Sequence, residues 1–102
     1  MVVTIFRSRL RPGCEAAYEE LAPRILELAR GMPGFVGIKT FTADDGERVS
    51  LVEFDTPEAQ AAWRDHPEHV RAQARGRAEF YAEYHIQVCS VERQVSYPRK
   101  GP

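Results

Sequence analysis

The sequence predicts an α+β domain of the ferredoxin-like type, in which two split βαβ repeats form a four-stranded antiparallel sheet with the helices on one face. Residues 2–43 and 48–91 both follow the order strand, helix, strand, and the two halves are similar in length. Few un-knotted topologies suit that order. Because the 102-residue chain has no obvious linker, one domain over residues 1–91 is expected, followed by a polar tail at residues 92–102.

The first half begins with a strand and a long helix. Residues 2–9, VVTIFRSR, are rich in β-branched and aromatic side chains, which is typical of a strand. Apolar side chains recur at alternating spacings of four and three over residues 14–32, which predicts one face of a helix. Gly31 is expected to cap its C-terminal end. Pro23 removes one helical hydrogen bond, so we expect a kink or a shifted helix start.

A hairpin joins the two halves and leads into the second helix. Residues 35–43 and 48–54 are predicted strands, and Gly46 in the turn between them suits a positive φ angle. Thr56 and Pro57 then indicate a helix start, because threonine is a good N-cap and proline fits the first helical position.

The second helix is expected to break before Pro67, because proline disfavours helical geometry at the preceding residue, His66. Pro67 also starts a second helical segment that extends to about Glu79. Residues 80–91, FYAEYHIQVCSV, are the predicted closing strand. The apolar side of the two helical segments is expected to consist of Ala59, Ala62, Trp63, Val70 and Ala74.

Composition excludes several functional classes. The chain has 14 basic and 15 acidic residues, so its net charge of −1 favours neither nucleic acid nor an anionic membrane as a partner. No apolar run approaches the ~18 residues of a membrane span, and the N-terminus lacks the residue order of a signal peptide. We therefore expect a cytoplasmic protein with Cys14 and Cys89 as reduced thiols. An RNA-recognition domain is not favoured, because its aromatic motif would lie on the third strand.

The predicted sheet has one face without helices. Val3 and Ile5 alternate with Thr4 and Phe6, so the first strand carries apolar side chains on both faces. A sheet of this kind is expected to be covered on both sides. With no further helix in the sequence, the expected cover is a second copy of the chain, which predicts a homodimer packed sheet to sheet.

The layout over residues 2–91 resembles the antibiotic biosynthesis monooxygenase family of dimeric α+β barrels. The resemblance lies in MPGFVG after the first helix, LVEFDTPEAQAAW through the hairpin strand and second helix, HPEHVRAQARG and FYAEYHIQVCSV. Relatives include cofactor-independent quinone-forming monooxygenases, haem-degrading enzymes, and aldolase-like or isomerase-like members. The resemblance therefore implies the fold, and a pocket between helices and sheet, but does not select among these activities.

For the monooxygenases, the resemblance implies a small aromatic or quinol-type substrate that loses a proton and then reacts with oxygen directly. No bound cofactor is expected, because the sequence has no dinucleotide fingerprint. Such a pocket needs aromatic walls and a base, and histidine titrates near neutrality. The candidate catalytic residues are His69 and Trp63, where Trp63 also suits a core position. The candidate substrate contacts are Phe6, Gln73, Phe80, Tyr81 and Tyr84.

A non-catalytic ligand-binding or stress-response dimer is the first alternative, and a haem-binding or haem-degrading protein is the second. The haem-degrading relatives need an asparagine on the first strand, a tryptophan on the second helix and a histidine about ten residues later. Here the tryptophan is Trp63, but Phe6 and Gln73 fall near the other two positions, and neither replaces the missing group.

The remaining histidines are assigned structural positions. His66 is expected to act as a hinge or cap, since it precedes Pro67. His66 and His69 are not expected to bind metal, because the proline breaks the helix that would align them. His85 is expected to lie on the opposite face of its strand from Tyr84, toward the dimer interface.

Overall fold

The computed structural model describes residues 1–98 and follows the predicted order of elements. The elements, in chain order, are β1 (Val2–Leu10), α1 (Glu15–Arg30), β2 (Phe35–Thr42), β3 (Arg48–Phe54), α2 (Pro57–Arg64), α3 (Pro67–Arg75), the π-helical turn η1 (Gly76–Phe80) and β4 (Tyr81–Ser90). The closing strand begins at Tyr81 instead of residue 80, because Phe80 still belongs to η1.

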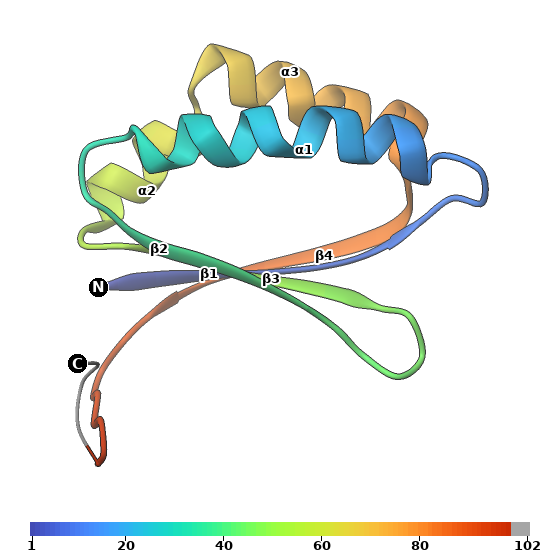
Figure 1. The fold of residues 1–102 in the computed structure, drawn as a ribbon. Helices are drawn as coiled ribbons and strands as arrows, with labels where there is room; N and C mark the ends of the chain where they lie inside the picture. Colours follow the sequence, from blue (N-terminus) through green and yellow to red (C-terminus); the bar gives the residue numbers. More distant parts are fainter. Residues whose placement is uncertain (99–102) are drawn as a thin grey trace.

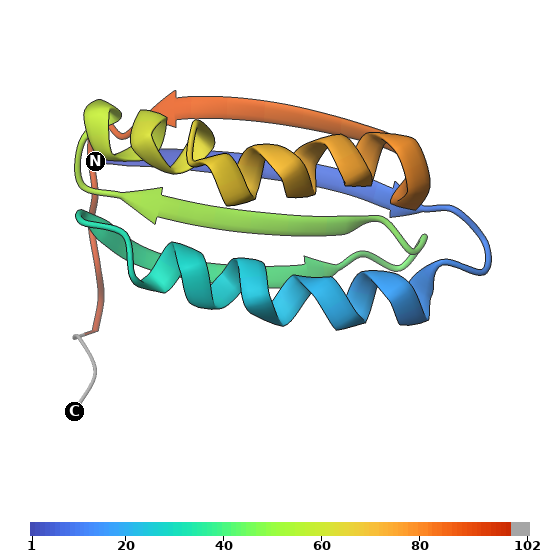
Figure 2. The same cartoon turned by 90° about the horizontal axis from the view of Figure 1, so that it is seen from above.

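The sheet is four-stranded with the order β2-β3-β1-β4, and every neighbouring pair is antiparallel. All the helices lie on one face of this sheet (Figure 1). Seen from above, α1 runs along the β2 side of the sheet and α3 runs along the β4 side (Figure 2). The predicted ferredoxin-like α+β fold is confirmed.

The first helix tests the expectations for Pro23 and Gly31. α1 runs without interruption from Glu15 to Arg30 with Pro23 inside it, so the helix start is not shifted. Gly31 follows α1 in a right-handed conformation, with φ of −86°, and its N–H is donated to carbonyl groups of the last helical turn. The left-handed residue of this connection is Gly34, with φ of +82°. Gly31 is therefore the C-cap of α1, as expected, and the positive φ angle of the connection is taken up by Gly34.

The starts of the later helices are as predicted. Thr56 Oγ1 accepts a hydrogen bond of 3.0 Å from the N–H of Ala59, and Pro57 occupies the first helical position of α2. His66 caps α3, since its Nδ1 accepts a hydrogen bond of 3.1 Å from the N–H of Glu68. The predicted break at Pro67 therefore divides one helical pattern into two helices, and His66 has the structural role expected for it.

The core lies under α1 and α2 at one end of the sheet. Its buried members are Ala29, Val52, Phe54 and Trp63, with half-buried apolar side chains of α1 and β2 packed around them. The expected apolar side of α3 was wrong: Val70 is 45% exposed, and Ala74 is also exposed. The half-buried side of α3 carries His69, Ala72 and Gln73 instead.

An irregularity where β1 meets β4 changes which side chains face the helices. The register pairs Arg9 with Glu83 but Leu10 with Tyr81, so Ala82 is an additional residue in β4. Strict alternation would place residues 81 and 84 on opposite faces. The bulge brings both rings to the helix side, which is a known effect of an extra residue in a strand.

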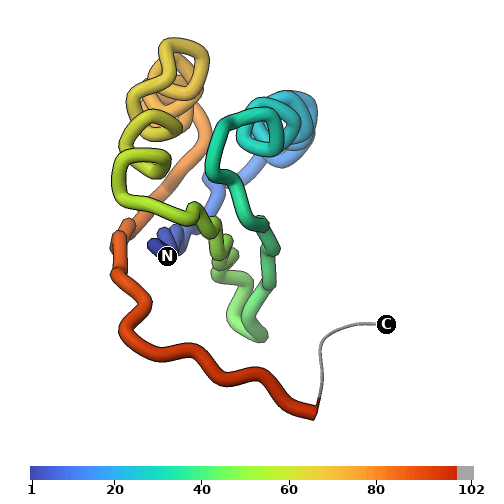
Figure 3. Tube along the Cα trace, turned by 90° about the vertical axis from the view of Figure 1, so that its left-hand side faces the viewer, coloured from blue at the N-terminus to red at the C-terminus, as the bar shows by residue number. Residues whose placement is uncertain are grey.

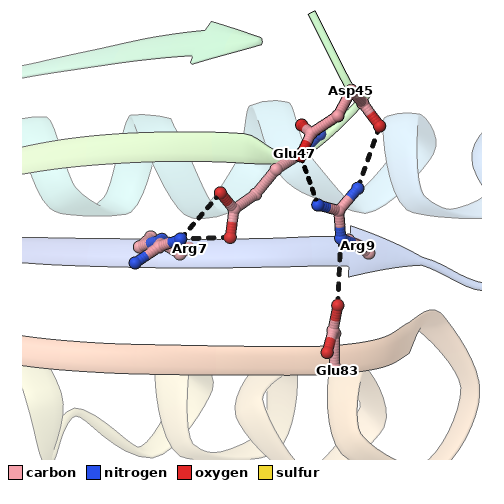
Figure 4. Close-up of polar contacts among 5 residues, drawn as sticks. All are labelled: Arg7, Arg9, Asp45, Glu47 and Glu83. Carbon is pink, nitrogen blue, oxygen red and sulfur yellow. Dashed lines mark hydrogen bonds and ion pairs between the residues drawn. The ribbon is translucent and has the colours of Figure 1, made fainter. Parts of the chain in front are cut away.

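The face without helices carries its own network of ion pairs (Figure 4). Arg7 contacts Glu47 through two hydrogen bonds of 3.0 Å each, and Arg9 pairs with Asp45 at 2.8 Å and with Glu83 at 2.9 Å. These contacts join β1 to the β2–β3 turn and to β4.

The C-terminal tail leaves the sheet on this same side. Residues 91–98 pass below the sheet without regular secondary structure (Figure 3). The last part of the expected polar tail, residues 99–102, lies outside the described residues.

Candidate active site

A cavity of about 820 Å³ lies between α1, α3 and the helix-covered face of the sheet. Figure 3 shows these elements from the end, with α1 beside the α2 and α3 helices in one layer above the strands. The wall from α1 includes Tyr18, Leu21 and Ile25, which are three of the apolar positions that define its helical stripe. The cavity is large enough for a ligand of drug-like size, because such sites span about 300–1,000 Å³.

Trp63 and His69 form one wall of the cavity as a stacked pair. Their ring centroids are 3.7 Å apart, and their planes differ by 17°. Trp63 is 6% exposed and packs against Phe54 of the core, with ring centroids 6.5 Å apart. The tryptophan is therefore both a core residue and a cavity wall, and it fixes the imidazole plane.

The hydrogen bonds of His69 fix which ring nitrogen carries the proton. Nδ1 lies 3.0 Å from the carbonyl oxygen of Trp63, and that oxygen can only accept. Gln73 Nε2 also lies 3.3 Å from Nδ1, but it donates at 2.9 Å to the carbonyl oxygen of Arg64. The shorter contact decides the tautomer: Nδ1–H donates to Trp63. Nε2 is thus the basic nitrogen, and no described residue forms a hydrogen bond with it.

Burial keeps the His69 ring neutral near pH 7. The pKa of His69 is lowered from its ordinary value of 6.5, mainly because burial disfavours the imidazolium. The hydrogen bond to the Trp63 carbonyl raises the pKa in the opposite direction, and the neighbouring His66 lowers it further. A neutral imidazole with a free Nε2 is able to accept a proton from a ligand in the cavity.

Aromatic rings line the opposite end of the cavity. The ring of Phe6 contacts those of Tyr81 and Tyr84, with centroids 5.3 and 6.0 Å apart, and Tyr18 lies 6.1 Å from Tyr81. The bulge in β4 is what allows Tyr81 and Tyr84 to take part together. Burial, followed by the neighbouring Tyr18, raises the pKa of Tyr81, so its hydroxyl remains protonated.

Comparison with known proteins identifies the family. The sequence model for antibiotic biosynthesis monooxygenase matches residues 1–75. The chain belongs to the antibiotic biosynthesis monooxygenase family. Another relative is the uncharacterized protein YqjZ of Bacillus subtilis (strain 168), which is 35% identical over 80 residues, or 78% of this chain and 70% of YqjZ.

Solved structures share the fold of this family member. Rv0793 from Mycobacterium tuberculosis aligns with a TM-score of 0.81 at 20% identity, covering 93% of this chain and 98% of that one. SnoaB, a cofactor-independent oxygenase from Streptomyces nogalater, aligns with a TM-score of 0.77 at 19% identity, covering 96% and 97%. At these identities the similarity establishes the fold alone.

The structure brings the candidate site residues together in this member of the family. All of them line the cavity: Phe6, Trp63, His69, Gln73, Phe80, Tyr81 and Tyr84. Their catalytic and binding roles stay predictions. Tyr18 and Arg48 also line the cavity, although neither was predicted as a site residue. Tyr18 was visible only as one position of an apolar stripe, and Arg48 only as the start of a strand.

His66 caps α3, and His85 lies on the face of the sheet without helices. His85 pairs with Arg7 across the strands, on the opposite face from Tyr84. No group of three or more metal-ligating side chains occurs within residues 1–98. Within the same residues, no helix is long and apolar enough to cross a membrane.

Proposed function

We propose that the protein is a monooxygenase for a small phenol- or hydroquinone-type aromatic substrate and works without a resident cofactor. The observation that carries this proposal is the neutral His69 with a free Nε2 in the wall of an aromatic-lined cavity. Membership of the antibiotic biosynthesis monooxygenase family supports the reaction class. The description of SnoaB as a cofactor-independent oxygenase supports chemistry without a cofactor.

In the proposed reaction, His69 Nε2 accepts the hydroxyl proton of a bound phenol. The resulting anion delocalises its charge into the ring, and a ring carbon reacts with molecular oxygen. With a phenol that has one oxygen, one oxygen atom becomes the second carbonyl of a quinone; with a hydroquinone, it becomes the hydroxyl group of a hydroxyquinone. The other leaves as water, together with the hydroxyl proton and the hydrogen of the attacked carbon. The substrate loses four electrons, and oxygen gains four.

The protein contributes three functions to this reaction. Nδ1–H of His69 donates to the Trp63 carbonyl, and this bond stabilises the imidazolium that forms when Nε2 takes the proton. The stacked indole holds the imidazole plane against the ligand. A ligand bound against the apolar walls would displace water from them, which strengthens electrostatic interactions inside the cavity.

Oxygen uptake with a panel of hydroquinones and anthrones tests the proposal. His69→Ala is expected to lower the rate by about 10²–10⁴-fold, the usual contribution of a general base. His85→Ala is the matched control, because His85 lies on the other face of the sheet. Uptake that is unchanged in His69→Ala and in Trp63→Phe would contradict the proposed site. Ligand binding without any uptake would favour a non-catalytic binding protein.

Haem binding is the second candidate, because the same free Nε2 is a suitable axial ligand for iron. Phe6 and Gln73, which line the cavity, do not supply the amide and the histidine of the haem-degrading relatives. A haem titration separates the two candidates: a Soret shift at stoichiometric haem supports haem binding, and its loss in His69→Ala assigns the ligand.

We also propose that a second copy of the chain covers the face without helices. Val3, Ile5 and Leu51 point to this face, as the register places them opposite to Phe6 and Val52. Five of its charged side chains, Arg7, Arg9, Asp45, Glu47 and Glu83, are paired with one another (Figure 4), which lowers the cost of burying them. Light scattering at micromolar concentration is expected to give a dimer, and Ile5→Lys a monomer. Val70→Lys on α3 is the control, and a monomeric wild type overturns the idea.

A further inference from the structure

The cavity wall is positively charged, although the whole chain has a net charge of −1. Its charged side chains are Arg30, Arg48, Arg77 and the single acid Glu19, whereas the side chain of Lys39 lies on the face without helices, since Lys39 pairs with Leu51. Three cations against one anion is the reverse of the overall balance. The excess of positive charge is therefore a local property of the cavity.

Among the described residues, these three cations have no counter-ions. The ion pairs of the fold use other basic side chains, namely Arg7, Arg9, Arg24, Arg64 and Arg75. Within residues 1–98, no carboxylate lies within 4.0 Å of the charged nitrogens of Arg30, Arg48 or Arg77. A wall with unpaired cations is complementary to an anionic ligand.

Arg48 is the cation best placed to contact such a ligand. It is half-buried, whereas Arg30, Lys39 and Arg77 are exposed. Its guanidinium carbon lies 5.0 Å from the centre of the Tyr18 ring, which holds the side chain against the cavity. Lys39 instead places its ammonium 5.6 Å from the centre of the Phe41 ring. A guanidinium presents a flat fork of N–H donors that matches a carboxylate.

The neighbours of Arg48 add neutral donors at the same end of the cavity. Tyr18 and Tyr81 lie with ring centroids 6.1 Å apart, and both line the cavity. The Tyr81 hydroxyl stays protonated because burial raises its pKa. Two tyrosine side chains and a guanidinium form a suitable set of hydrogen-bond donors for a carboxylate.

The acceptor His69 lies toward the other end. Arg48 begins β3, and Phe54, which contacts Trp63, ends it. At about 3.3 Å per residue, the two ends of this strand are roughly 20 Å apart along the backbone. The cavity of about 820 Å³ lined by both residues has room for two or three fused rings between an anion at Arg48 and a proton donor at His69.

We infer that this cavity binds an aromatic carboxylate, with the carboxylate at Arg48, Tyr18 and Tyr81 and the ring system extending toward Trp63 and His69. The inference rests on the proposed use of the cavity as the ligand site, but it requires no oxygen chemistry. Neutral hydroquinones could still be oxidised if it fails, and carboxylates could still bind if the proposed oxidation fails.

Binding can be followed through Trp63, which is the single tryptophan of the chain and lines the cavity. Quenching of its fluorescence and isothermal titration calorimetry are measured with anthraquinone-2-carboxylate and with the neutral anthraquinone-2-carboxamide. Wild type is expected to bind the carboxylate about tenfold or more tightly than the amide, because hydrogen bonds to charged groups are stronger. Added salt should reduce this preference. Equal affinity for the two compounds overturns the inference, whatever the variants do.

Two arginine variants then locate the carboxylate. Arg48→Gln should remove most of the preference by weakening carboxylate binding about tenfold or more, with little change for the amide. Arg71→Gln changes the net charge by the same amount, but Arg71 is exposed on α3 and does not line the cavity. It should leave both affinities unchanged. Equal losses in the two variants would mean that overall charge, and not Arg48, attracts the ligand.

Discussion

The imidazole of His69 lies face to face with the indole of Trp63 at 3.7 Å, while its Nδ1 bonds to the carbonyl oxygen of the same tryptophan at 3.0 Å. Trp63 therefore fixes both the ring plane and the tautomer of His69. The α2–α3 break makes this possible, because His66 and Pro67 turn the chain so that His69 folds back onto α2. The position of the His69 imidazole depends on packing in the core, since Trp63 belongs to the core and also to the cavity wall.

Removing the indole should destabilise the fold and not only the site. Trp63→Ala deletes a ring that packs against Phe54 and is 6% exposed, so we expect a loss of about 3–5 kcal/mol in the free energy of unfolding. Trp63→Phe keeps an aromatic wall and should cost less. Urea unfolding must be followed by circular dichroism, because both variants lack tryptophan fluorescence. A loss below about 1 kcal/mol for Trp63→Ala would contradict the core role.

Stability should decrease with falling pH in a window set by His69. Because burial lowers its folded-state pKa below 6.5, the unfolded chain binds the proton more strongly between the two values. Lowering the pH through this window therefore favours unfolding, whereas above it both states are neutral and His69 adds no pH dependence. The pKa of Asp45 is lowered by Arg9 and that of Glu68 by Arg24, so these groups act only in more acidic solution.

Urea unfolding from about pH 8 to about pH 3 measures this effect and includes the range in which the carboxylates titrate. His69→Gln should flatten the decline of the free energy of unfolding below about pH 6.5 and leave the steeper acid limb in place. Parallel curves for the two proteins would show that His69 titrates equally in the folded and unfolded chains.

The rate of oxygen uptake should also depend on the protonation of His69. If His69 Nε2 is the base, kcat/KM falls as pH decreases through its folded-state pKa, which lies below 6.5. Activity should thus persist to lower pH than an exposed histidine would allow. The rate of oxygen uptake with a neutral hydroquinone gives this profile. A limb centred above pH 6.5 would point to another group.

The order of strands and helices could be predicted from sequence because it follows from local signals. Thr56, Pro57 and Pro67 fix helix starts through their own backbone geometry, and alternation fixes strands. The cavity rests on relations that no local pattern contains. Tyr81 and Tyr84 share a face only because a bulge changes the register, which depends on β1. Arg48 and Tyr18 are 30 positions apart in the sequence and come into contact only in the folded chain. The half-buried side of α3 carries His69, whereas the sequence pattern favoured Val70.

Arg11 is expected to stabilise the junction of η1 and β4, which forms one end of the cavity. Its guanidinium donates three hydrogen bonds of 2.7–3.1 Å to the carbonyl oxygens of Arg77, Ala78 and Tyr81. These carbonyls lie at a helix end, where they lack helical partners. Arg11→Gln is expected to lower the free energy of unfolding by about 1–3 kcal/mol. Arg11→Lys should restore little, because a single ammonium cannot reproduce the fork. Full recovery in Arg11→Lys would assign the effect to charge alone.

Gly34 and Gly46 should respond differently to the same substitution, although both have positive φ angles, of 82° and 91°. A Cβ at Gly46 meets nothing within 4 Å, so Gly46→Ala should cost only the left-handed strain of about 1–2 kcal/mol. A Cβ at Gly34 would lie 2.7 Å from Ala59 Cβ, which no side-chain rotation relieves, and 2.4 Å from Asp55 Oδ1. Gly34→Ala should therefore cost an additional 1–3 kcal/mol or so, as for overpacking. Denaturant unfolding of the two variants gives the difference directly. Equal costs would mean that α2 yields to the new methyl group and that the connection before β2 is not closely packed against it.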